Sequence, residues 1–333
     1  MMSQTADITN CCPWETPGVR AFVAHILGEE TLTQARFSAL TQGLSNDNAL
    51  IEAGGQAWVL RINRDESSAF CQRTFEADNW QLAARAGLAP PLLGMSGDGR
   101  CYLSARLEQG DWPQKYAEIP ASGFKHFATL STPGKSVCPG PDETSDAGLL
   151  FALLKGLQQL PTPANPKGFA AQWQDYQRAL DEGLPRWQHC QEWRRAQRQL
   201  ASCSQAIQGA LQRIEHKPFA LQYSHRDLTP HNLLCHGGKL YCIDFEYACA
   251  SHPLWDLAAV LASHRLTADA QSSLVHAYLD FHPQLDQSDA PLIVDAVALH
   301  WYFGAIWALL MAGQSGDNNY LSWFYRYLQL AVS

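Results

Sequence analysis

The fold is decided by the segment Ser224-His225-Arg226-Asp227-Leu228-Thr229-Pro230-His231-Asn232-Leu233-Leu234, which is followed by Cys242-Ile243-Asp244-Phe245-Glu246. Asp227 and Asn232 stand in one loop, and a hairpin across Gly237-Gly238 returns the chain to Asp244. This order of loop and hairpin directs a carboxylate, an amide carbonyl and a second carboxylate toward one cavity.

These three side chains match the needs of phosphoryl transfer. That reaction requires an acceptor for the hydroxyl proton and side chains that hold Mg²⁺ against the phosphates. Because Mg²⁺ prefers oxygen ligands and takes few from the protein, Asn232 and Asp244 are a sufficient pair. A single His-x-Asp would be interpreted as a capped turn, with Asn232 and Asp244 as strand ends. The complete pattern of His-x-Asp-x4-Asn, a hairpin and Ile-Asp-Phe-Glu favours the catalytic interpretation.

The same segments resemble a known enzyme family. The octapeptide that begins at His225 is similar to the catalytic loop of choline, ethanolamine and thiamine kinases and of aminoglycoside phosphotransferases. The run Ile243-Asp-Phe-Glu-Tyr-Ala resembles the metal-binding segment of choline and thiamine kinases. The run His252-Pro-Leu-Trp-Asp-Leu-Ala-Ala resembles the start of the next helix in bacterial choline kinases. The chain therefore resembles the choline/ethanolamine/thiamine kinase branch of the aminoglycoside phosphotransferase (APH)-like family.

The resemblance implies a role for each matched residue. Asp227 would be the catalytic base, and His225, which opens the same loop, would be the second catalytic residue. Asn232 and Asp244 would be the ligands of Mg²⁺. Asp256 would brace the loop, and the alternative for this residue is a simple cap of the following helix.

The first third of the chain offers a matching nucleotide site. Gly43-Leu44-Ser45-Asn46 resembles the turn with which choline kinases cover the ATP phosphates, although such a turn alone is more often an ordinary hairpin loop. Arg61 stands where kinases keep a phosphate-binding Lys, and a guanidinium can also contact phosphate oxygens. We expect Glu76 to pair with Arg61; its alternative is a solvated helix glutamate. Leu107-Glu108 should form the hinge where backbone groups receive adenine.

The hydrophobic pattern, together with the resemblance, predicts an α+β, bilobal protein-kinase-like fold. We expect a small β-rich N-terminal lobe over residues 1–107 and a larger, mainly helical C-terminal lobe over residues 108–333. The first lobe should hold one helix and about five strands. The strands are expected at residues 37–40, 49–52, 58–62, 92–95 and 101–107, with a hairpin turn at Gly54-Gly55 and the helix at 67–86.

The second lobe follows helical spacing over most of its length. Helical patterns cover residues 149–160, 173–214 and 254–331, and two strands are expected at 233–235 and 240–243. Residues 111–145 are expected to form a long loop, whose role the sequence leaves open. Within that loop, Thr132-Pro-Gly-Lys-Ser ends like a Walker A motif, but Thr129 stands where its first glycine belongs, so we interpret the match as chance.

Composition excludes several functional classes. The net charge of −8 argues against a nucleic-acid partner. The ten cysteines include no Cys-x-x-Cys pair and the start of the chain lacks an apolar signal peptide, so we expect buried free thiols and a cytoplasmic location. The apolar stretch 296–311 is interrupted by polar residues and is expected to be a buried helix, with no membrane partner. The oligomeric state stays open.

The helical lobe is rich in aromatic side chains that could bind a cationic acceptor through cation–π contacts. Trp301 ranks first among them, and Glu246 could form an acidic wall near the cation; a Trp or Tyr at helical spacing is, however, more often a core residue. The other candidates are Tyr247, Trp255, Tyr302, Trp307, Trp323, Phe324, Tyr325 and Tyr327.

We therefore expect an ATP- and Mg²⁺-dependent phosphotransferase that acts on the hydroxyl of a small, cationic metabolite such as choline, ethanolamine or thiamine. One alternative is an aminoglycoside or sugar phosphotransferase with the same machinery. Another is a catalytically silent nucleotide-binding regulatory module, against which the presence of Asp227, Asn232 and Asp244 argues. The sequence does not choose among the substrates.

Overall fold

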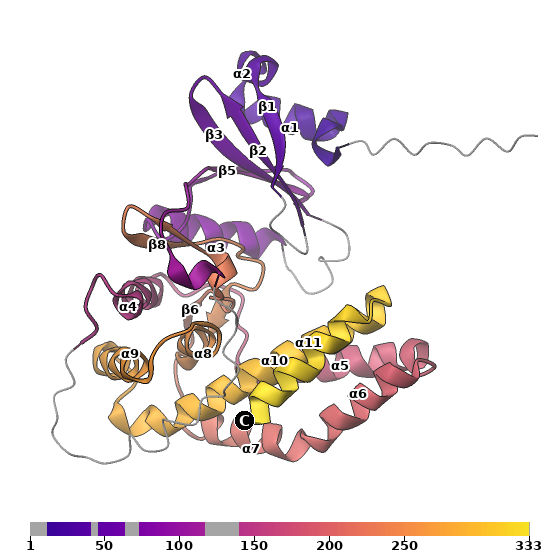
Figure 1. Cartoon of the computed structure of the whole chain (residues 1–333), viewed down its shortest axis with the longest axis vertical. Coiled ribbons are helices and arrows are strands. Elements are labelled where there is room, and N and C mark those ends of the chain that lie inside the picture. The colour runs from indigo at the N-terminus through magenta and orange to yellow at the C-terminus, as the bar shows by residue number, and fades with distance from the viewer. Residues whose placement is uncertain (1–11, 41–45, 64–72, 117–139, 333) are drawn as a thin grey trace, which may run out of the picture. The chain divides into compact units, whose positions relative to one another are not determined.

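The computed structural model describes residues 12–40, 46–63, 73–116 and 140–332 (Figure 1). The chain divides into two compact units, with the boundary between Leu107 and Glu108. The first is a small antiparallel sheet with helices, and the second is larger and mainly helical. The predicted α+β fold, a small sheet lobe followed by a larger helical lobe, is confirmed.

The sheet of the first unit has five antiparallel strands in the order β1-β2-β3-β5-β4. The turn between β2 and β3 is formed by Gly54 and Gly55, whose φ angles of 57° and 77° suit the two-residue hairpin that the sequence predicts. The strands are β1 (Arg36–Leu40), β2 (Asn46–Ala53), β3 (Gln56–Asn63), β4 (Leu92–Met95) and β5 (Cys101–Ala105).

The prediction of one helix in the first unit is wrong. Besides α3 (Arg73–Arg85), the unit contains η1 (Pro13–Glu15), α1 (Pro17–Leu27) and α2 (Glu29–Gln34). Val23 of α1 is fully buried in one apolar cluster with side chains of the sheet, such as Ile51 and Leu60. The helix was missed because its apolar residues Val19, Phe22, Val23 and Ile26 recur at helical spacing over fewer than three turns.

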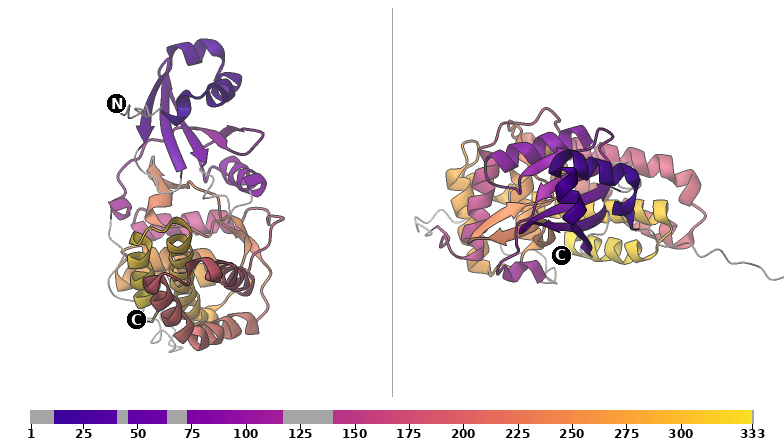
Figure 2. Two further views of the ribbon diagram at one scale, coloured as in Figure 1. Left: turned by 90° about the vertical axis from the view of Figure 1, so that its right-hand side faces the viewer. Right: turned by 90° about the horizontal axis from the view of Figure 1, so that it is seen from above.

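The second unit consists of helices around a long central one, α10, with α11 beside it (Figures 1 and 2). The predicted helical stretch 173–214 is divided into α5, α6 and α7, which begin and end separately. The helices are η3 (Pro113–Tyr116), α4 (Asp146–Gln158), α5 (Phe169–Trp187), α6 (Gln191–Ser202), α7 (Ser204–His216), η5 (Pro230–Asn232), α8 (Leu254–Ser263), α9 (Ala268–Phe281), η6 (Gln287–Asp289), α10 (Ala290–Ser315) and α11 (Asn319–Val332).

Helix α10 is apolar on all sides because it forms the core of the second unit. The helical stretch Gln287–Ser315 is long and apolar enough to cross a membrane, but 61% of its most apolar window is buried inside the protein. The expectation of a buried helix at 296–311 is therefore confirmed.

Two short antiparallel strand pairs flank the loops of Asp227 and Asp244 in the second unit. Strand β6 (Gln222–Ser224) pairs with β9 (Cys249–Ser251), and β7 (Leu233–His236) pairs with β8 (Lys239–Cys242). The sequence predicts the β7–β8 hairpin because Gly237-Gly238 marks its turn. It does not reveal β6 or β9, which are three residues long and give no alternating pattern.

Candidate active site

One buried carboxylate, that of Asp256, holds the start of the loop between β6 and η5. Asp256, in the first turn of α8, accepts hydrogen bonds from Ser224 Oγ (2.8 Å), from the backbone N–H of His225 (2.9 Å) and from the backbone N–H of Arg226 (2.8 Å). Burial raises the pKa of Asp256, and the hydrogen bonds and the Arg226 charge oppose this rise. Asp256 therefore contacts the loop itself, beyond any cap of its own helix.

His225 links the loop to the segment that carries Asp244. Its Nδ1 accepts a hydrogen bond from the backbone N–H of Asp227 (3.4 Å). In this tautomer Nε2 carries the proton and donates it to the carbonyl of Ile243 (3.1 Å). The ring is fully buried and packs against Phe245, with 4.8 Å between the ring centroids. Burial lowers the pKa of His225 to about 4, so the ring is neutral. With both nitrogens engaged by backbone groups, His225 orients the loop.

Asp227 and Asn232 face each other across the loop. The Asn232 Nδ2 group donates to Asp227 Oδ2 (2.7 Å) and to the Asp227 carbonyl (3.1 Å). Burial raises the pKa of Asp227 to about 7, the negative charge of Asp244 adds to the rise, and the hydrogen bond from Asn232 opposes it. A carboxylate with a pKa near neutrality is matched to proton abstraction at neutral pH.

The β7–β8 hairpin delivers Asp244 to the same place. Leu233 stands opposite Cys242 in the ladder, and one step further the backbone N–H of Ile243 donates to the Asn232 carbonyl (2.9 Å). Asp244 follows directly, with a φ angle of 65°. The structure thus brings together Asp227, Asn232 and Asp244, as the sequence predicts from the loop and the hairpin.

The donor set of this site fits a magnesium ion better than a softer metal. No group of three His, Cys, Asp or Glu side chains suited to a metal occurs in the described part of the chain. Asn232 uses its amide nitrogen toward Asp227, so its amide oxygen remains for a cation, and Asp244 adds a carboxylate. Oxygen ligands from one or two side chains are what Mg²⁺ takes when phosphates and water complete its shell. The mutual repulsion of Asp227 and Asp244 also favours a bound cation.

Aromatic side chains of α10 and α11 lie close to Asp227. Burial and the Asp227 charge both raise the pKa of Tyr327, which places its phenol within electrostatic reach of that carboxylate. Trp301 stacks on Tyr327 with 5.5 Å between the ring centroids, and a Cβ at Gly304 would stand 3.3 Å from the Tyr327 ring. The sequence ranks Trp301 first and leaves Tyr327 among the other aromatic candidates. No spacing in the sequence distinguishes Tyr327 from the other aromatics of α11, because its nearness to Asp227 depends on how the helices pack.

Two further aromatic or acidic candidates have definite positions. Glu246 is partly buried, two residues after Asp244. Trp255 is 5% exposed, and the guanidinium carbon of Arg226 lies 4.0 Å from its ring centroid. Since a protein cation covers this ring, Trp255 is not free to stack on a substrate from that side.

In the first unit, Arg61 forms the predicted ion pair. Its Nη2 donates to Glu76 Oε1 (2.5 Å), its Nε donates to Asn63 Oδ1 (2.8 Å), and the Tyr102 hydroxyl donates to Glu76 Oε2 (3.2 Å). Arg61 and Glu76 are 7% and 1% exposed, so Glu76 is not a solvated helix residue. The network fixes the direction of the guanidinium.

The remaining nucleotide candidates are only partly within the described chain. Gly43, Leu44 and Ser45 lie outside the described residues, as does the Walker-like segment 132–136, whereas Asn46 begins β2 and is buried. At the expected hinge, the Glu108 carbonyl lies 3.0 Å from Nδ1 of His236, and the backbone N–H of Gly110 donates to the Cys235 carbonyl (2.6 Å). Backbone groups that follow Leu107 are thus attached to the β7–β8 hairpin.

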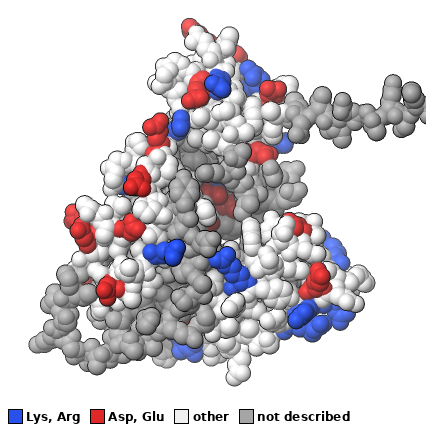
Figure 3. Space-filling model, in the orientation of Figure 1, with Lys and Arg blue, Asp and Glu red and all other residues white. Residues whose placement is uncertain are grey.

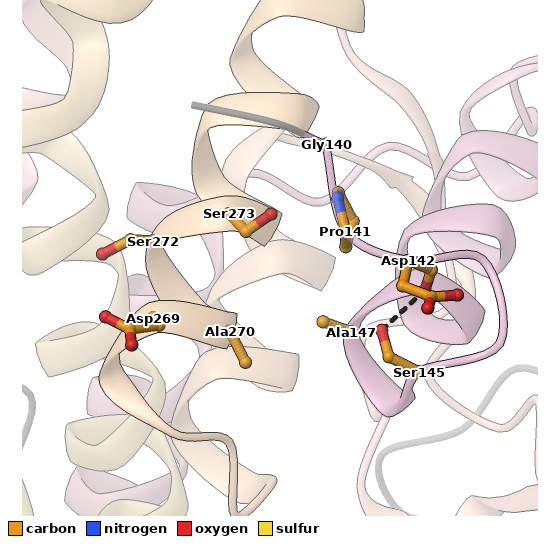
Figure 4. A pocket seen from close by; sticks show the side chains of 9 residues that line it. All are labelled: Gly140, Pro141, Asp142, Ser145, Ala147, Asp269, Ala270, Ser272 and Ser273. Atoms are coloured by element: carbon orange, nitrogen blue, oxygen red, sulfur yellow. Dashed lines mark hydrogen bonds between the residues drawn. The ribbon is translucent and has the colours of Figure 1, made fainter. Parts of the chain in front are cut away.

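A surface hollow of about 410 Å³ lies between the segment before α4 and the first turns of α9 (Figure 4). Asp142 and Asp269 line it together with small side chains, and Ser145 Oγ bonds the Asp142 carbonyl (2.6 Å) within it. None of the site residues proposed from the sequence is among its lining residues, so it is separate from the loop of Asp227.

Comparisons with known proteins find chains that are similar in sequence and in fold. The model of a family described as the phosphotransferase enzyme family, APH, matches residues 36–287. Among curated proteins, Protein LicA from Haemophilus influenzae is 24% identical over 260 residues, which cover 77% of this chain and 65% of that protein. The chain therefore spans just under two thirds of the length of this relative.

Solved structures show the same fold. The choline kinase LicA from Streptococcus pneumoniae superposes with a TM-score of 0.64 at 15% identity, covering 93% of this chain and 99% of that one. A structure of LicA in complex with AMP gives 0.64 at 15% identity, covering 94% and 96%. A macrolide 2'-phosphotransferase type I gives 0.55 at 18% identity, covering 96% and 98%. At these identities the likeness establishes the fold, and the substrate must be argued from the site.

Proposed function

Because the chain belongs to the APH phosphotransferase enzyme family, we propose that it transfers the γ-phosphoryl group of ATP to the hydroxyl of a small, cationic metabolite such as choline, ethanolamine or thiamine. The single observation that carries the proposal is the convergence of Asp227, Asn232 and Asp244 at one end of the β7–β8 hairpin. This set supplies a proton acceptor and two oxygen ligands, which is what phosphoryl transfer asks of the protein.

Asp227 acts as the general base in this proposal. Its carboxylate accepts the proton of the acceptor hydroxyl as the oxygen attacks the γ-phosphorus, and the Asn232 amide holds it in place. With a pKa raised to about 7, the carboxylate is a stronger base than an ordinary Asp and is still substantially ionised at neutral pH.

Asn232 and Asp244 would hold Mg²⁺. The ion would neutralise charge on the β- and γ-phosphates. On the protein side, the hydrogen bond from Ile243 N–H to the Asn232 carbonyl keeps the two ligands in register with each other. The ligands therefore come preorganised by a rigid hairpin rather than by a mobile loop.

The nucleotide roles in the first unit are part of the proposal. Arg61, directed by Glu76, contacts the ATP phosphates, and Asn46, the first residue of β2, completes the segment 43–46 that covers them. Leu107 and Glu108 provide the backbone groups for adenine. The AMP complex of LicA supports nucleotide binding by this fold.

A cationic acceptor is supported by the groups around Asp227. The stacked pair Trp301 and Tyr327 provides π-faces. Negative charge comes from Asp227 and Asp244, and from Glu246, which follows Asp244 by two residues. A cation held against an aromatic face gains about 0.5–2 kcal/mol, more when water is excluded. The similar fold of the choline kinase LicA from S. pneumoniae supports the same class of acceptor.

A larger antibiotic acceptor is the second candidate. The macrolide 2'-phosphotransferase shares the fold over nearly all of this chain, and the catalytic set of Asp227, Asn232 and Asp244 would serve either acceptor. The aromatic pair beside Asp227 favours the smaller, cationic class. A silent regulatory module is disfavoured because all three residues are present and converge.

We further propose a cytoplasmic protein that has no nucleic-acid or membrane partner. The cysteines of the described residues are free thiols, as expected in a reducing compartment. Acidic and basic side chains are interspersed over the face that Figure 3 shows, in keeping with the net charge of −8. On that face, the described residues form no continuous basic stripe of the kind that phosphate backbones need.

The test is an acceptor panel. Purified protein is incubated with ATP and Mg²⁺ and with choline, ethanolamine, thiamine, kanamycin or a macrolide, and ADP release is measured against Asp227→Ala protein as the blank. Turnover with one of the three cationic alcohols, absent in the variant, supports the proposal. Turnover with an antibiotic alone selects the second candidate, and ATP binding without turnover on any acceptor selects the silent module.

A further inference from the structure

Arg226 adopts a backbone conformation that arginine rarely takes. Its φ angle is 70°, in the left-handed region, and among the described residues only Asp244 shares a positive φ without being glycine. Glycine would fit this position without strain. The presence of a long side chain at a position suited to glycine therefore points to a function of that side chain.

The guanidinium of Arg226 reaches three separate elements of the helical unit. Its carbon lies 4.0 Å from the ring centroid of Trp255 on α8. Its Nη2 donates to Gln172 Oε1 on α5 (2.6 Å), and its Nη1 lies 3.7 Å from the Sγ of Cys249 on β9. Arg226 is only partly buried, yet its charge is directed inward to these contacts.

The platform beneath the guanidinium is rigid. Trp255 stacks on Phe169 (4.3 Å between ring centroids, 21° between planes) and on Phe303 (5.6 Å, 21°). The stack therefore joins α5, α8 and α10 under the loop. The neighbour of Trp255 in sequence, Asp256, accepts the backbone N–H of Arg226 (2.8 Å), so one turn of α8 holds both the backbone and the side chain of this residue.

A second attachment keeps α5 in place relative to the loop. Just before α5, the backbone N–H of Lys167 donates to the Ala250 carbonyl (2.8 Å), and the N–H of Ala250 donates to the Asn165 carbonyl (3.0 Å). Since Ala250 belongs to β9, which pairs with β6, the start of α5 is tied to the strand that leads into the Asp227 loop. Gln172 therefore meets Arg226 from a fixed direction.

We propose that Arg226 is a positioning residue: its guanidinium, clamped between Trp255 and Gln172, holds the loop in the left-handed turn that orients Asp227. The effect on phosphoryl transfer rests on the proposed function, whereas the effect on the loop does not. Burial and the charges of Asp244 and Asp256 raise the pKa of Asp227 and the Asn232 hydrogen bond opposes the rise, while the guanidinium of Arg226 is engaged with Trp255 and Gln172. Its influence passes through the backbone of the loop.

The variants distinguish the effect of the backbone conformation at residue 226 from the effect of its side chain. Arg226→Gly keeps the positive φ without strain and removes the clamp, while Arg226→Lys keeps the charge but loses the planar fork that stacks and bonds at once. Gln172→Met removes one bond of the clamp and leaves the loop sequence untouched. Arg194→Met, an exposed arginine of α6, is the matched control for loss of a guanidinium.

Two measurements are made on each variant. The first is kcat, with the KM values for ATP and the acceptor, on the acceptor that the wild-type protein phosphorylates. The second is hydrogen exchange of the peptide 222–232, which contains the N–H groups that Asp256 holds. The exchange measurement needs no substrate.

We expect kcat to fall by roughly 10–100-fold in Arg226→Gly, because a displacement of about 1 Å of a catalytic group costs that much. The KM for ATP should stay within about twofold of the wild-type value. Arg226→Lys and Gln172→Met should lose less kcat than Arg226→Gly. Hydrogen exchange in 222–232 should rise most in the variant that loses most kcat. Arg194→Met should match the wild type.

If Arg226→Gly keeps the kcat of the wild type and its hydrogen exchange in 222–232, the proposal is overturned. An equal fall in the Arg194→Met control would overturn it as well. A wild-type protein that phosphorylates no acceptor would refute the proposed function alone. In that case faster exchange in Arg226→Gly still supports the positioning role and unchanged exchange rejects it.

Discussion

The carboxylate of Asp256 offers the sharpest test of how the site is held together. Its Oδ1 accepts from Ser224 Oγ and from the backbone N–H of Arg226, and its Oδ2 accepts from the backbone N–H of His225. In Asp256→Asn the amide oxygen can serve the first two donors, and the new NH₂ group then faces the His225 N–H. One buried donor is left without an acceptor, and two bonds lose their assistance from charge.

The magnitude follows from these three bonds. A buried donor without a partner costs about 1–3 kcal/mol, and a neutral acceptor gives roughly half the energy of a charged one. Against this, the neutral amide avoids the desolvation that raises the pKa of Asp256. We expect a net loss of about 2 kcal/mol in the free energy of unfolding, and a fall in kcat of roughly tenfold or more because the His225 N–H belongs to the loop that carries Asp227.

The assay is urea unfolding followed by tryptophan fluorescence, together with kcat on the accepted substrate. Ser224→Ala is the control, since it removes one of the three bonds and leaves both backbone bonds intact; it should cost about 1 kcal/mol and little activity. An Asn variant that unfolds at the wild-type urea concentration and keeps its kcat would refute the idea that Asp256 holds the loop.

Three other outcomes are expected. Asp227→Ala should lower kcat by orders of magnitude with nearly unchanged ATP affinity, measured by steady-state kinetics and calorimetry; retained activity would remove Asp227 as the base. Arg61→Ala should mainly raise the KM for ATP, and an unchanged KM would remove Arg61 from the phosphate site. Burial lowers the pKa of His264 to about 4, so its protonation favours the unfolded chain: stability is complete above about pH 6.5 and falls toward pH 4, by about 2 kcal/mol between pH 7 and pH 5. His264→Leu should flatten that part of the urea-midpoint profile against pH, and an unchanged profile would contradict the assignment.

The sequence predicts those parts of the site whose geometry is local. A two-residue glycine turn sets the register of the short β7–β8 hairpin and so brings Asp244 to Asp227 and Asn232. Such a register follows from the sequence alone. The ion pair of Arg61 and Glu76 is also local, since it joins a strand to the next helix of the same unit.

The parts that could not be predicted depend on tertiary packing. Gln172 of α5 reaches Arg226 across 54 residues of sequence, and Tyr327 of α11 lies within electrostatic reach of Asp227. No periodicity in the sequence encodes how α5, α8, α10 and α11 cross one another. Strand β6, which leads into the catalytic loop, is too short to give a pattern and exists through its ladder with β9.

The contrast between local and tertiary contacts also appears in the backbone around Asp227. Arg226 and Asp244 each hold a left-handed backbone angle, which costs about 1–3 kcal/mol per residue and persists only where the surroundings enforce it. At Arg226, three of the enforcing contacts come from α8, α5 and β9 of the helical unit, through Trp255, Gln172 and Cys249. Phe303 of α10 supports Trp255, and the same helix carries Trp301 of the proposed acceptor site. A repacking of α10 that fits a different acceptor would therefore also shift the platform that we propose orients Asp227, so under the proposed function the choice of acceptor and the position of Asp227 depend on each other.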